Sequence, residues 1–176
     1  APQPGADGRA PSWRKQRIFA QAEKLAGERD RWIRRNRYFF AEDWRYMRFL
    51  VPRGKRVLDL GSGTGDLLAQ LEPSEGVGVD FSPAMTARAR EKYPQLRFIA
   101  ADVEKLGQSA TPAGPFDAIV MSDTIGSLDD CLETFRGLHG FCRPETRLVV
   151  TYYSRLWEPL FRLAGALRLK QSTLPQ

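Results

Sequence analysis

Five short apolar runs, separated by stretches of helical pattern, limit the fold of this chain more than any other feature. The runs are residues 56–60, 77–80, 96–101, 116–121 and 147–153. The helical stretches between and after them are residues 66–71, 83–93, 128–138 and 156–170. The centres of the runs lie about 20 to 30 residues apart, which is the spacing of strand–helix–strand units in a parallel sheet. The pattern predicts an α/β fold with a Rossmann-like, doubly wound, mostly parallel sheet, whose ligands bind beyond the carboxyl ends of the strands.

The chain before the first run predicts a tail and two amphipathic helices. Residues 1–11 hold three prolines and two glycines among few apolar residues, so we expect a disordered tail. Helices are expected from Ser12 to Gly27 and over residues 30–50, and Pro52 and Gly54 end the second. Their expected inward positions are Trp13, Ile18, Ala22, Leu25, Trp32, Tyr38, Phe39, Trp44, Met47 and Leu50. The expected organisation is a tail (1–11), a basic helical segment (12–52) and a cofactor-binding α/β domain (53–176).

The positive charge is concentrated in the helical segment. The whole chain carries +6, whereas residues 1–56 hold 15 Lys and Arg against 6 Asp and Glu, which gives +9. Such a surface can meet an anionic lipid or a phosphorylated substrate, or it can be a solvated helix face; nucleic acid is the less expected partner. Because no apolar run reaches the roughly 18 residues of a membrane span and the N-terminus lacks a signal-peptide layout, we expect a cytoplasmic protein.

Few side chains suit metal or redox chemistry. Cys131 and Cys142 are expected to be free thiols, and they do not make a metal site together with the single histidine, His139. His139 is expected at the surface, on the side of the sheet away from the carboxyl ends of the strands. The sequence therefore predicts no metal site.

The loop after the first run reads LDLGSGTG, from Leu58 to Gly65. A dinucleotide fingerprint requires GxGxxG, but this loop reads GxGxG and Asp66 occupies the place of the third glycine. Asp59 and Asp66 would both face a pyrophosphate, and like charges at that range cost one or more kcal/mol, roughly. A cationic ligand such as S-adenosylmethionine suits these acids better. A nicotinamide-dependent oxidoreductase and a non-catalytic cofactor-binding module remain as alternatives.

Polar residues also follow the other predicted strands. Asp80 ends the second run, where a carboxylate can accept hydrogen bonds from ribose hydroxyls, and Phe81 could lie against an adenine ring. Asp102 and Val103 follow the third run and could meet the edge of the base. Ser122 and Asp123 follow the fourth run, and we expect them beside Asp59 and Gly61 because parallel strands end at the same edge of the sheet. Asp123 is the weak candidate for a catalytic base.

The motifs LDLGSGTGDLL, VGVDFSPAMTARAR, FIAADVEKL and FDAIVMSDTIGSL, in this order, resemble those of class I S-adenosylmethionine-dependent methyltransferases. The resemblance implies that the glycine loop holds the methionine part of the cofactor and that Asp59 supports the loop and the methionine ammonium. It implies Asp80 for the ribose and Asp102 for the adenine. The complete set of expected cofactor-binding residues is Asp59, Gly61, Ser62, Gly63, Gly65, Asp80, Phe81, Met85, Asp102, Val103 and Ser122.

A finer resemblance concerns both flanks of the motifs. The segments NRYFFAEDWRYMRFLVPRGK and TRLVVTYYSRLWEPLFRLAGALRLK are similar to bacterial methyltransferase domains that accompany glycosyltransferases. That likeness implies a glycan or a lipid-linked sugar as methyl acceptor. Since the family's sheet usually has seven strands, we expect a fold shortened after the fifth strand and its helix. Residues 156–170 are expected to pack on the sheet or to touch a membrane surface.

Overall fold

The structure is a computed structural model that describes residues 10–106 and 112–152. Five strands form one sheet in the order β3-β2-β1-β4-β5, and every neighbouring pair is parallel. The strands are β1 (Arg56–Leu60), β2 (Glu75–Asp80), β3 (Arg97–Ala100), β4 (Ala118–Ser122) and β5 (Arg147–Thr151). The predicted α/β, doubly wound sheet is confirmed. The helix expected over residues 156–170 lies outside the described residues.

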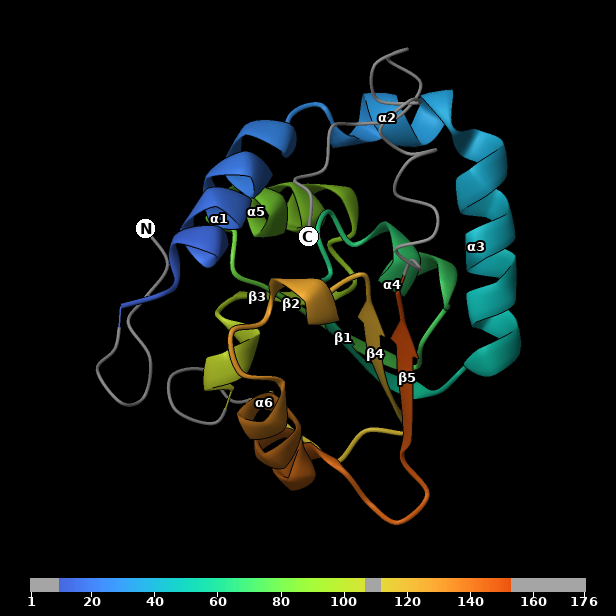
Figure 1. Ribbon diagram of the computed structural model, residues 1–176. Helices are drawn as coiled ribbons and strands as arrows, with labels where there is room; N and C mark the ends of the chain where they lie inside the picture. Colours follow the sequence, from blue (N-terminus) through green and yellow to red (C-terminus); the bar gives the residue numbers. More distant parts are fainter. Residues whose placement is uncertain (1–9, 107–111, 153–176) are drawn as a thin grey trace.

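Helices cover both faces of the sheet (Figure 1). The α-helices are α1 (Trp13–Leu25), α2 (Arg29–Arg35), α3 (Arg37–Leu50), α4 (Asp66–Gln70), α5 (Pro83–Lys92) and α6 (Cys131–Leu138). The 3₁₀ helices are η1 (Val103–Lys105), η2 (Ile125–Ser127) and η3 (His139–Phe141). Because side chains alternate along a strand, Leu58 joins a core with Leu138 of α6, whereas Val57 joins a second core with Met47 of α3.

The N-terminal helices differ from the sequence prediction in two ways. The expected helix over residues 30–50 is two helices, because the backbone leaves the helical region at Asn36 (φ −110°, ψ 31°) and its side-chain amide donates to the Trp32 carbonyl at 3.0 Å. Met47 is fully buried as predicted. Trp13 and Tyr38, however, are 69% and 79% exposed. The spacing of apolar residues therefore predicted the wrong inward face for α1 and for the first turn of α3.

The strand order creates a crevice at the carboxyl edge of the sheet. From β1 the chain continues to β2 on one side and later returns to β4 on the other, so the loops after β1 and β4 diverge. Such a switch point is where open α/β sheets bind ligands. The arrowheads of β4 and β5 point toward the end of the molecule where α1 and α2 lie (Figure 1). Among the described helices, none has the length and apolar character needed to cross a bilayer.

Candidate functional site

A pocket of about 350 Å³ lies at this crevice. Its walls come from the glycine loop, from the ends of β2, β3 and β4, and from α1, α2 and α3. The catalytic candidate Asp123 lines the pocket, and so do ten of the eleven residues predicted to bind the cofactor. These ten are Asp59, Gly61, Ser62, Gly63, Asp80, Phe81, Met85, Asp102, Val103 and Ser122. The structure therefore places these residues around one cavity, and their individual roles remain predictions.

The three glycines of the loop meet different surroundings. All have positive φ: 78° at Gly61, 53° at Gly63 and 80° at Gly65. A Cβ on Gly61 would lie 2.1 Å from Thr124 Oγ1, and one on Gly65 would lie 2.5 Å from the Phe98 ring. Gly65 begins α4 and does not line the pocket, so packing explains it. A Cβ on Gly63 would have no atom within 4 Å, which leaves open space for a ligand beside the backbone.

Asp80 ties the glycine loop to the end of β2. It is buried, and its carboxylate accepts hydrogen bonds from the Gly63 N–H at 2.8 Å and from the Ser82 N–H at 2.9 Å. Burial raises the pKa of Asp80 to about 6, although the two backbone hydrogen bonds oppose the shift. The loop conformation therefore depends on a carboxylate that also lines the pocket.

Asp59 is the least satisfied acid of the site. It is 1% exposed, and within the described residues its Oδ2 has no hydrogen-bond partner; the same is true of the buried Ser62 Oγ. Burial, assisted by the charge of Asp80, raises the pKa of Asp59 to about 7. Buried polar atoms without partners are costly, and these two line one cavity, as does Asp102, whose buried Oδ2 also lacks a hydrogen-bond partner among the described residues. They fit a ligand that brings hydrogen-bond donors or positive charge.

Asp66 plays a different part from the one expected. Its Oδ1 accepts hydrogen bonds from Lys92 Nζ at 2.6 Å and from the Tyr93 hydroxyl at 2.9 Å, and its Oδ2 accepts one from the Thr64 hydroxyl at 2.6 Å. Lys92 therefore compensates its charge. Asp66 therefore adds no uncompensated negative charge that would disfavour a pyrophosphate in this loop. The acids that would disfavour one are Asp59 and Asp80.

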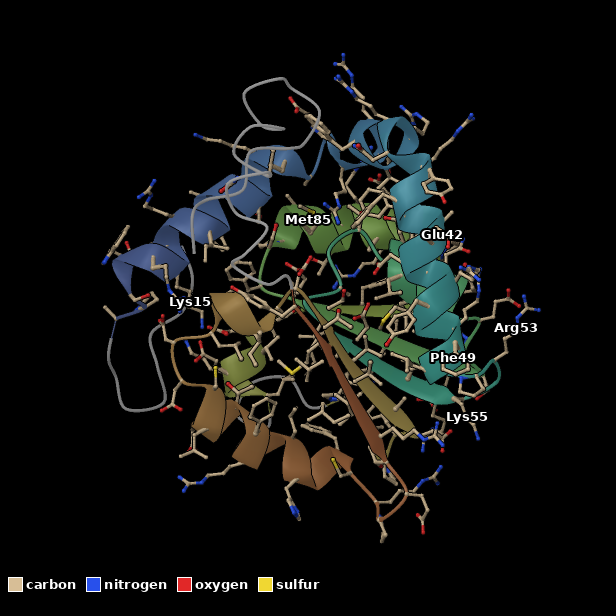
Figure 2. The ribbon with its side chains drawn as sticks, turned by 45° about the vertical axis from the view of Figure 1, so that its right-hand side comes forward. Lys15, Glu42, Phe49, Arg53, Lys55 and Met85 are labelled. Atoms are coloured by element: carbon tan, nitrogen blue, oxygen red, sulfur yellow. The ribbon has the colours of Figure 1, made fainter. Side chains whose placement is uncertain are left out.

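Lys15 of α1 belongs to the pocket, which the sequence did not indicate. Its side chain is almost completely buried, and Nζ lies 2.8 Å from Asp102 Oδ1 and 2.7 Å from Oδ2, with Glu104 in contact as well (Figure 2). Burial by itself would lower the pKa of Lys15, but the hydrogen bonds to Asp102 and Glu104 outweigh burial and the pKa is raised. The pair spans 87 residues of sequence, so no local pattern could reveal it.

Apolar side chains from α2 and α3 form the remaining wall. They are Ile33, Phe39, Phe40 and Trp44. The rings of Phe40 and Trp44 have centroids 5.8 Å apart, and the Arg29 guanidinium lies 5.5 Å from the Phe40 ring centroid. Asp43 also faces this wall, and burial raises its pKa. Arg37 and Tyr38, at the start of α3, are both exposed, and neither lines the pocket.

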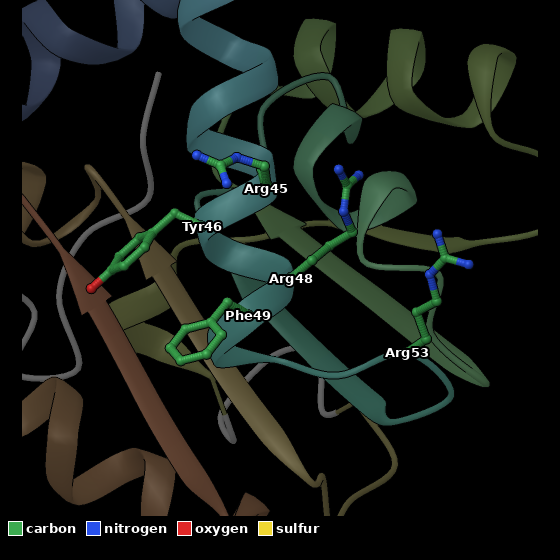
Figure 3. Close-up of a pocket in the computed structure, with 5 residues that line it drawn as sticks. All are labelled: Arg45, Tyr46, Arg48, Phe49 and Arg53. Atoms are coloured by element: carbon green, nitrogen blue, oxygen red, sulfur yellow. The ribbon is translucent and has the colours of Figure 1, made fainter.

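A second hollow lies on the outer side of α3 and the segment that follows it (Figure 3). It is wider than the pocket but shallow, and it is lined by Arg45, Tyr46, Arg48, Phe49 and Arg53. Its arginines have surface partners, since Arg45 pairs with Glu42 at 2.5 Å and Arg53 with Glu72 at 3.0 Å. Because it contains no residue from the carboxyl edge of the sheet, we take the smaller pocket as the functional site.

No group of three or more His, Cys, Asp or Glu side chains in the part of the chain that the structure describes could hold a metal ion. Cys131 and Cys142 are free, as predicted. His139 begins η3, beyond α6, and does not line the pocket, so it takes no part in the site.

Comparison with known protein families gives the family of this chain. The sequence model described as "Methyltransferase domain" matches residues 27–174. The chain belongs to the methyltransferase domain family. This membership confirms the predicted resemblance to class I S-adenosylmethionine-dependent methyltransferases. Helix α1 precedes the matched segment.

Curated relatives of this methyltransferase domain act on quinone precursors according to their names. The demethylmenaquinone methyltransferase of Beutenbergia cavernae is 35% identical over 116 residues, which is 64% of this chain and 47% of the relative. That of Thermus thermophilus is 36% identical over 124 residues, 63% of this chain and 55% of the relative. The methyltransferase domain thus spans about half the length of the curated relatives that it matches.

Solved structures support the fold. An S-adenosylmethionine-dependent methyltransferase of Thermotoga maritima, described as a possible histamine N-methyltransferase, superposes with a TM-score of 0.69. The match covers 85% of this chain and 70% of that structure at 21% identity. At this identity the likeness concerns the fold alone.

Proposed function

We propose that this methyltransferase domain binds S-adenosylmethionine in the pocket and transfers its methyl group to a small aromatic acceptor. One observation carries the proposal: Asp59 Oδ2 and Ser62 Oγ are buried, have no hydrogen-bond partner in the part of the chain that the structure describes, and line the pocket beside the open face of Gly63. S-adenosylmethionine carries an ammonium and a sulfonium, and these supply the donors and positive charge that the site lacks. When bound, the cofactor provides an electrophilic methyl group.

The residues present suit the parts of this cofactor. Asp59 and Ser62 would hold the amino-acid part next to the glycine loop, and Asp80 at the end of β2 would accept hydrogen bonds from the ribose hydroxyls. Each oxygen of Asp80 accepts one backbone hydrogen bond and retains capacity for another. Asp102 and Val103 at the end of β3 would meet the adenine ring.

The acceptor side of the pocket favours an aromatic molecule. Ile33, Phe40 and Trp44 present apolar surface, on which a planar ring packs well. The names of the two curated relatives point the same way, since both act on demethylmenaquinone. We therefore propose an acceptor of the quinol type, and the glycan or lipid-linked sugar expected from sequence finds no support in these relatives.

Methyl transfer joins the methyl carbon to the acceptor atom and returns the bonding electron pair to sulfur, while the acceptor loses a proton. Positioning of the two reactants and exclusion of water supply much of the rate, because the sulfonium is already a good leaving group. Asp123 is our candidate for the proton acceptor. It lies at the rim, has φ 55° and is held by its backbone N–H, which donates to the Thr151 carbonyl at 3.0 Å.

Calorimetry with S-adenosylhomocysteine tests the cofactor. We expect wild-type protein to bind it and Asp80→Asn to bind at least about tenfold more weakly, the effect of losing hydrogen bonds to a charged group. Glu91→Gln, an exposed acid on α5, is the matched control and should bind like wild type. Absence of wild-type binding, or equal binding by Asp80→Asn, would refute the proposal.

Transfer of a labelled methyl group tests the acceptor. The wild-type chain is incubated with labelled S-adenosylmethionine and either a naphthoquinol with an unsubstituted ring position or a polyisoprenyl-linked sugar. Labelling of the naphthoquinol is the expected result. Labelling of the sugar instead would overturn the aromatic acceptor and leave the cofactor assignment intact.

A further inference from the structure

Helix α1 lies outside the segment that matches the family, yet its N-terminal end is fastened to the rim of the pocket. The Ser12 N–H donates to Asp129 Oδ2 at 3.0 Å, and the Arg14 guanidinium donates to the Gly126 carbonyl at 2.8 Å. Both partners belong to the segment between β4 and α6. This end of α1 is therefore attached to the loop that follows the fourth strand.

The C-terminal half of α1 is fastened to the segment that follows β2. The Glu23 carboxylate accepts hydrogen bonds from the Ser82 hydroxyl at 2.5 Å and from the Ala84 N–H at 3.1 Å. Phe19 packs edge-to-face on Phe81, with ring centroids 5.5 Å apart. Helix α1 thus bridges the loops after β2 and β4, on the side of the pocket where β3 ends.

That side is where the base of a bound nucleoside would lie. The sheet order places β2 between β1 and β3, so a ligand with its amino-acid part at β1 and its ribose at Asp80 extends its base toward β3. Asp102 follows β3 and lines the pocket. Its Oδ2 lies 2.7 Å from Lys15 Nζ but has no hydrogen-bond partner of suitable geometry among the described residues, so the atom can still accept a hydrogen bond.

We propose that Lys15 is a positioning residue that lets Asp102 distinguish an amino group from a carbonyl at position 6 of the purine. This rests on the function proposed above. An ionised carboxylate accepts from a 6-amino group and repels a 6-oxo group, whereas a protonated one can donate to the oxo group. The side chains of Asp102 and Glu104 both contact the Lys15 ammonium, and the Glu104 N–H donates to Asp102 Oδ1 at 3.2 Å.

Without the Lys15 ammonium, the buried Asp102 and the partly buried Glu104 would face each other with only the more distant Lys105, among the described residues, to offset their charges. Lys105 lies farther away, with Nζ 4.0 Å from Asp102 Oδ2, and burial lowers its pKa. Glu104 is fixed by a second set of bonds, since its Oε1 accepts from the Asp129 N–H at 2.9 Å and the Asp130 N–H at 2.5 Å. Asp102 would therefore be the carboxylate that turns away, and the preference for adenine would be lost.

The test compares two ligands by calorimetry: S-adenosylhomocysteine and S-inosylhomocysteine, which differ in the amino or oxo group at position 6. We expect wild type to prefer the adenine compound by about 10- to 100-fold, the range for one hydrogen bond to a charged group. In Lys15→Met the ratio should fall to about threefold or less, and Lys15→Arg should restore most of it. Lys24→Met, an exposed lysine of the same helix, is the matched control.

The ratio separates positioning from a general loss of structure. If Lys15→Met weakens both ligands equally and keeps the wild-type ratio, Lys15 only holds α1 in place and the proposal is overturned. A wild-type protein that binds both ligands equally also overturns it. If wild type binds neither, the proposed function itself fails. Should Lys15→Met not fold, Lys15→Gln keeps a polar side chain at this position without the charge, and a wild-type ratio there again contradicts the proposal.

Discussion

The raised pKa of Asp59 makes the stability of the empty domain dependent on pH. The pKa is about 7 in the folded chain against an ordinary value of 3.8, so between these values the folded state binds more protons than the unfolded state. The contribution of Asp59 to stability is therefore greatest below about pH 4 and is lost as the pH rises through 7. Three pKa units correspond to about 4 kcal/mol, which is an upper bound for the loss at pH 8.

Asp59→Asn removes this ionisation while keeping the size of the side chain. At pH 4 the variant should be less stable than wild type by about 1–3 kcal/mol, because it buries an amide in place of a neutral carboxyl group. Between pH 4 and pH 8 the difference in free energy of unfolding, variant minus wild type, should rise by up to about 4 kcal/mol. Denaturant unfolding at a series of pH values measures it, with Glu91→Gln as control.

Asp59→Asn should weaken ligand binding at high pH, although at high pH it makes the empty domain more stable relative to wild type. The ammonium group of the ligand favours the ionised carboxylate, so S-adenosylhomocysteine should bind wild type increasingly tightly as the pH rises from 5 to 8 and should release a proton from Asp59. Titrations in two buffers of different ionisation enthalpy count that proton. Asp59→Asn should bind more weakly at pH 8 and lose most of this release, with a part left from Asp80. Parallel stability curves for variant and wild type, or equal affinities at pH 8, would show that the reasoning is wrong.

Further predictions concern the glycine loop, the core and the rim. Gly61→Ala should lower the free energy of unfolding by about 3 kcal/mol or more, from the clash with Thr124 and the positive φ, as measured by denaturant unfolding. Gly63→Ala should cost only about 1 kcal/mol in the same assay but weaken S-adenosylhomocysteine at least about tenfold in calorimetry; a stability loss equal to that of Gly61→Ala would contradict this. Met47→Ala should destabilise by about 2–5 kcal/mol through the cavity it leaves, and a loss below about 1 kcal/mol would contradict the buried position. Asp123→Asn should slow methyl transfer without changing the affinity for S-adenosylhomocysteine, and unchanged turnover would remove it as the base.

The fold was predictable where its causes are local. Buried parallel strands read as short apolar runs, and all five were located to within a few residues. The start of α5 was also readable, because Ser82 caps the helix by accepting from the Met85 N–H and Pro83 occupies its first turn. The break at Asn36 was not, since a polar residue between two amphipathic stretches is compatible with one helix or two.

The residues that line the pocket could be predicted from sequence where strand ends supply them. Those supplied by the N-terminal helices could not be predicted. Topology brings the carboxyl ends of parallel strands to one edge, so Asp80 and Asp102 could be placed together without coordinates. Helix α1 packs on the polar rim of the pocket instead of on an apolar sheet face. Its buried position is therefore Lys15, whereas the hydrophobic pattern assigned that role to Trp13.

The attachment of α1 has a practical consequence for how the binding unit is delimited. A fragment cut at residue 27, where the family match begins, would retain every strand and the whole glycine loop. It would nevertheless expose Phe81 and leave Asp102 and Glu104 as neighbouring acids without a cation from α1. The smallest fragment expected to bind the cofactor with its native preference therefore begins before Ser12.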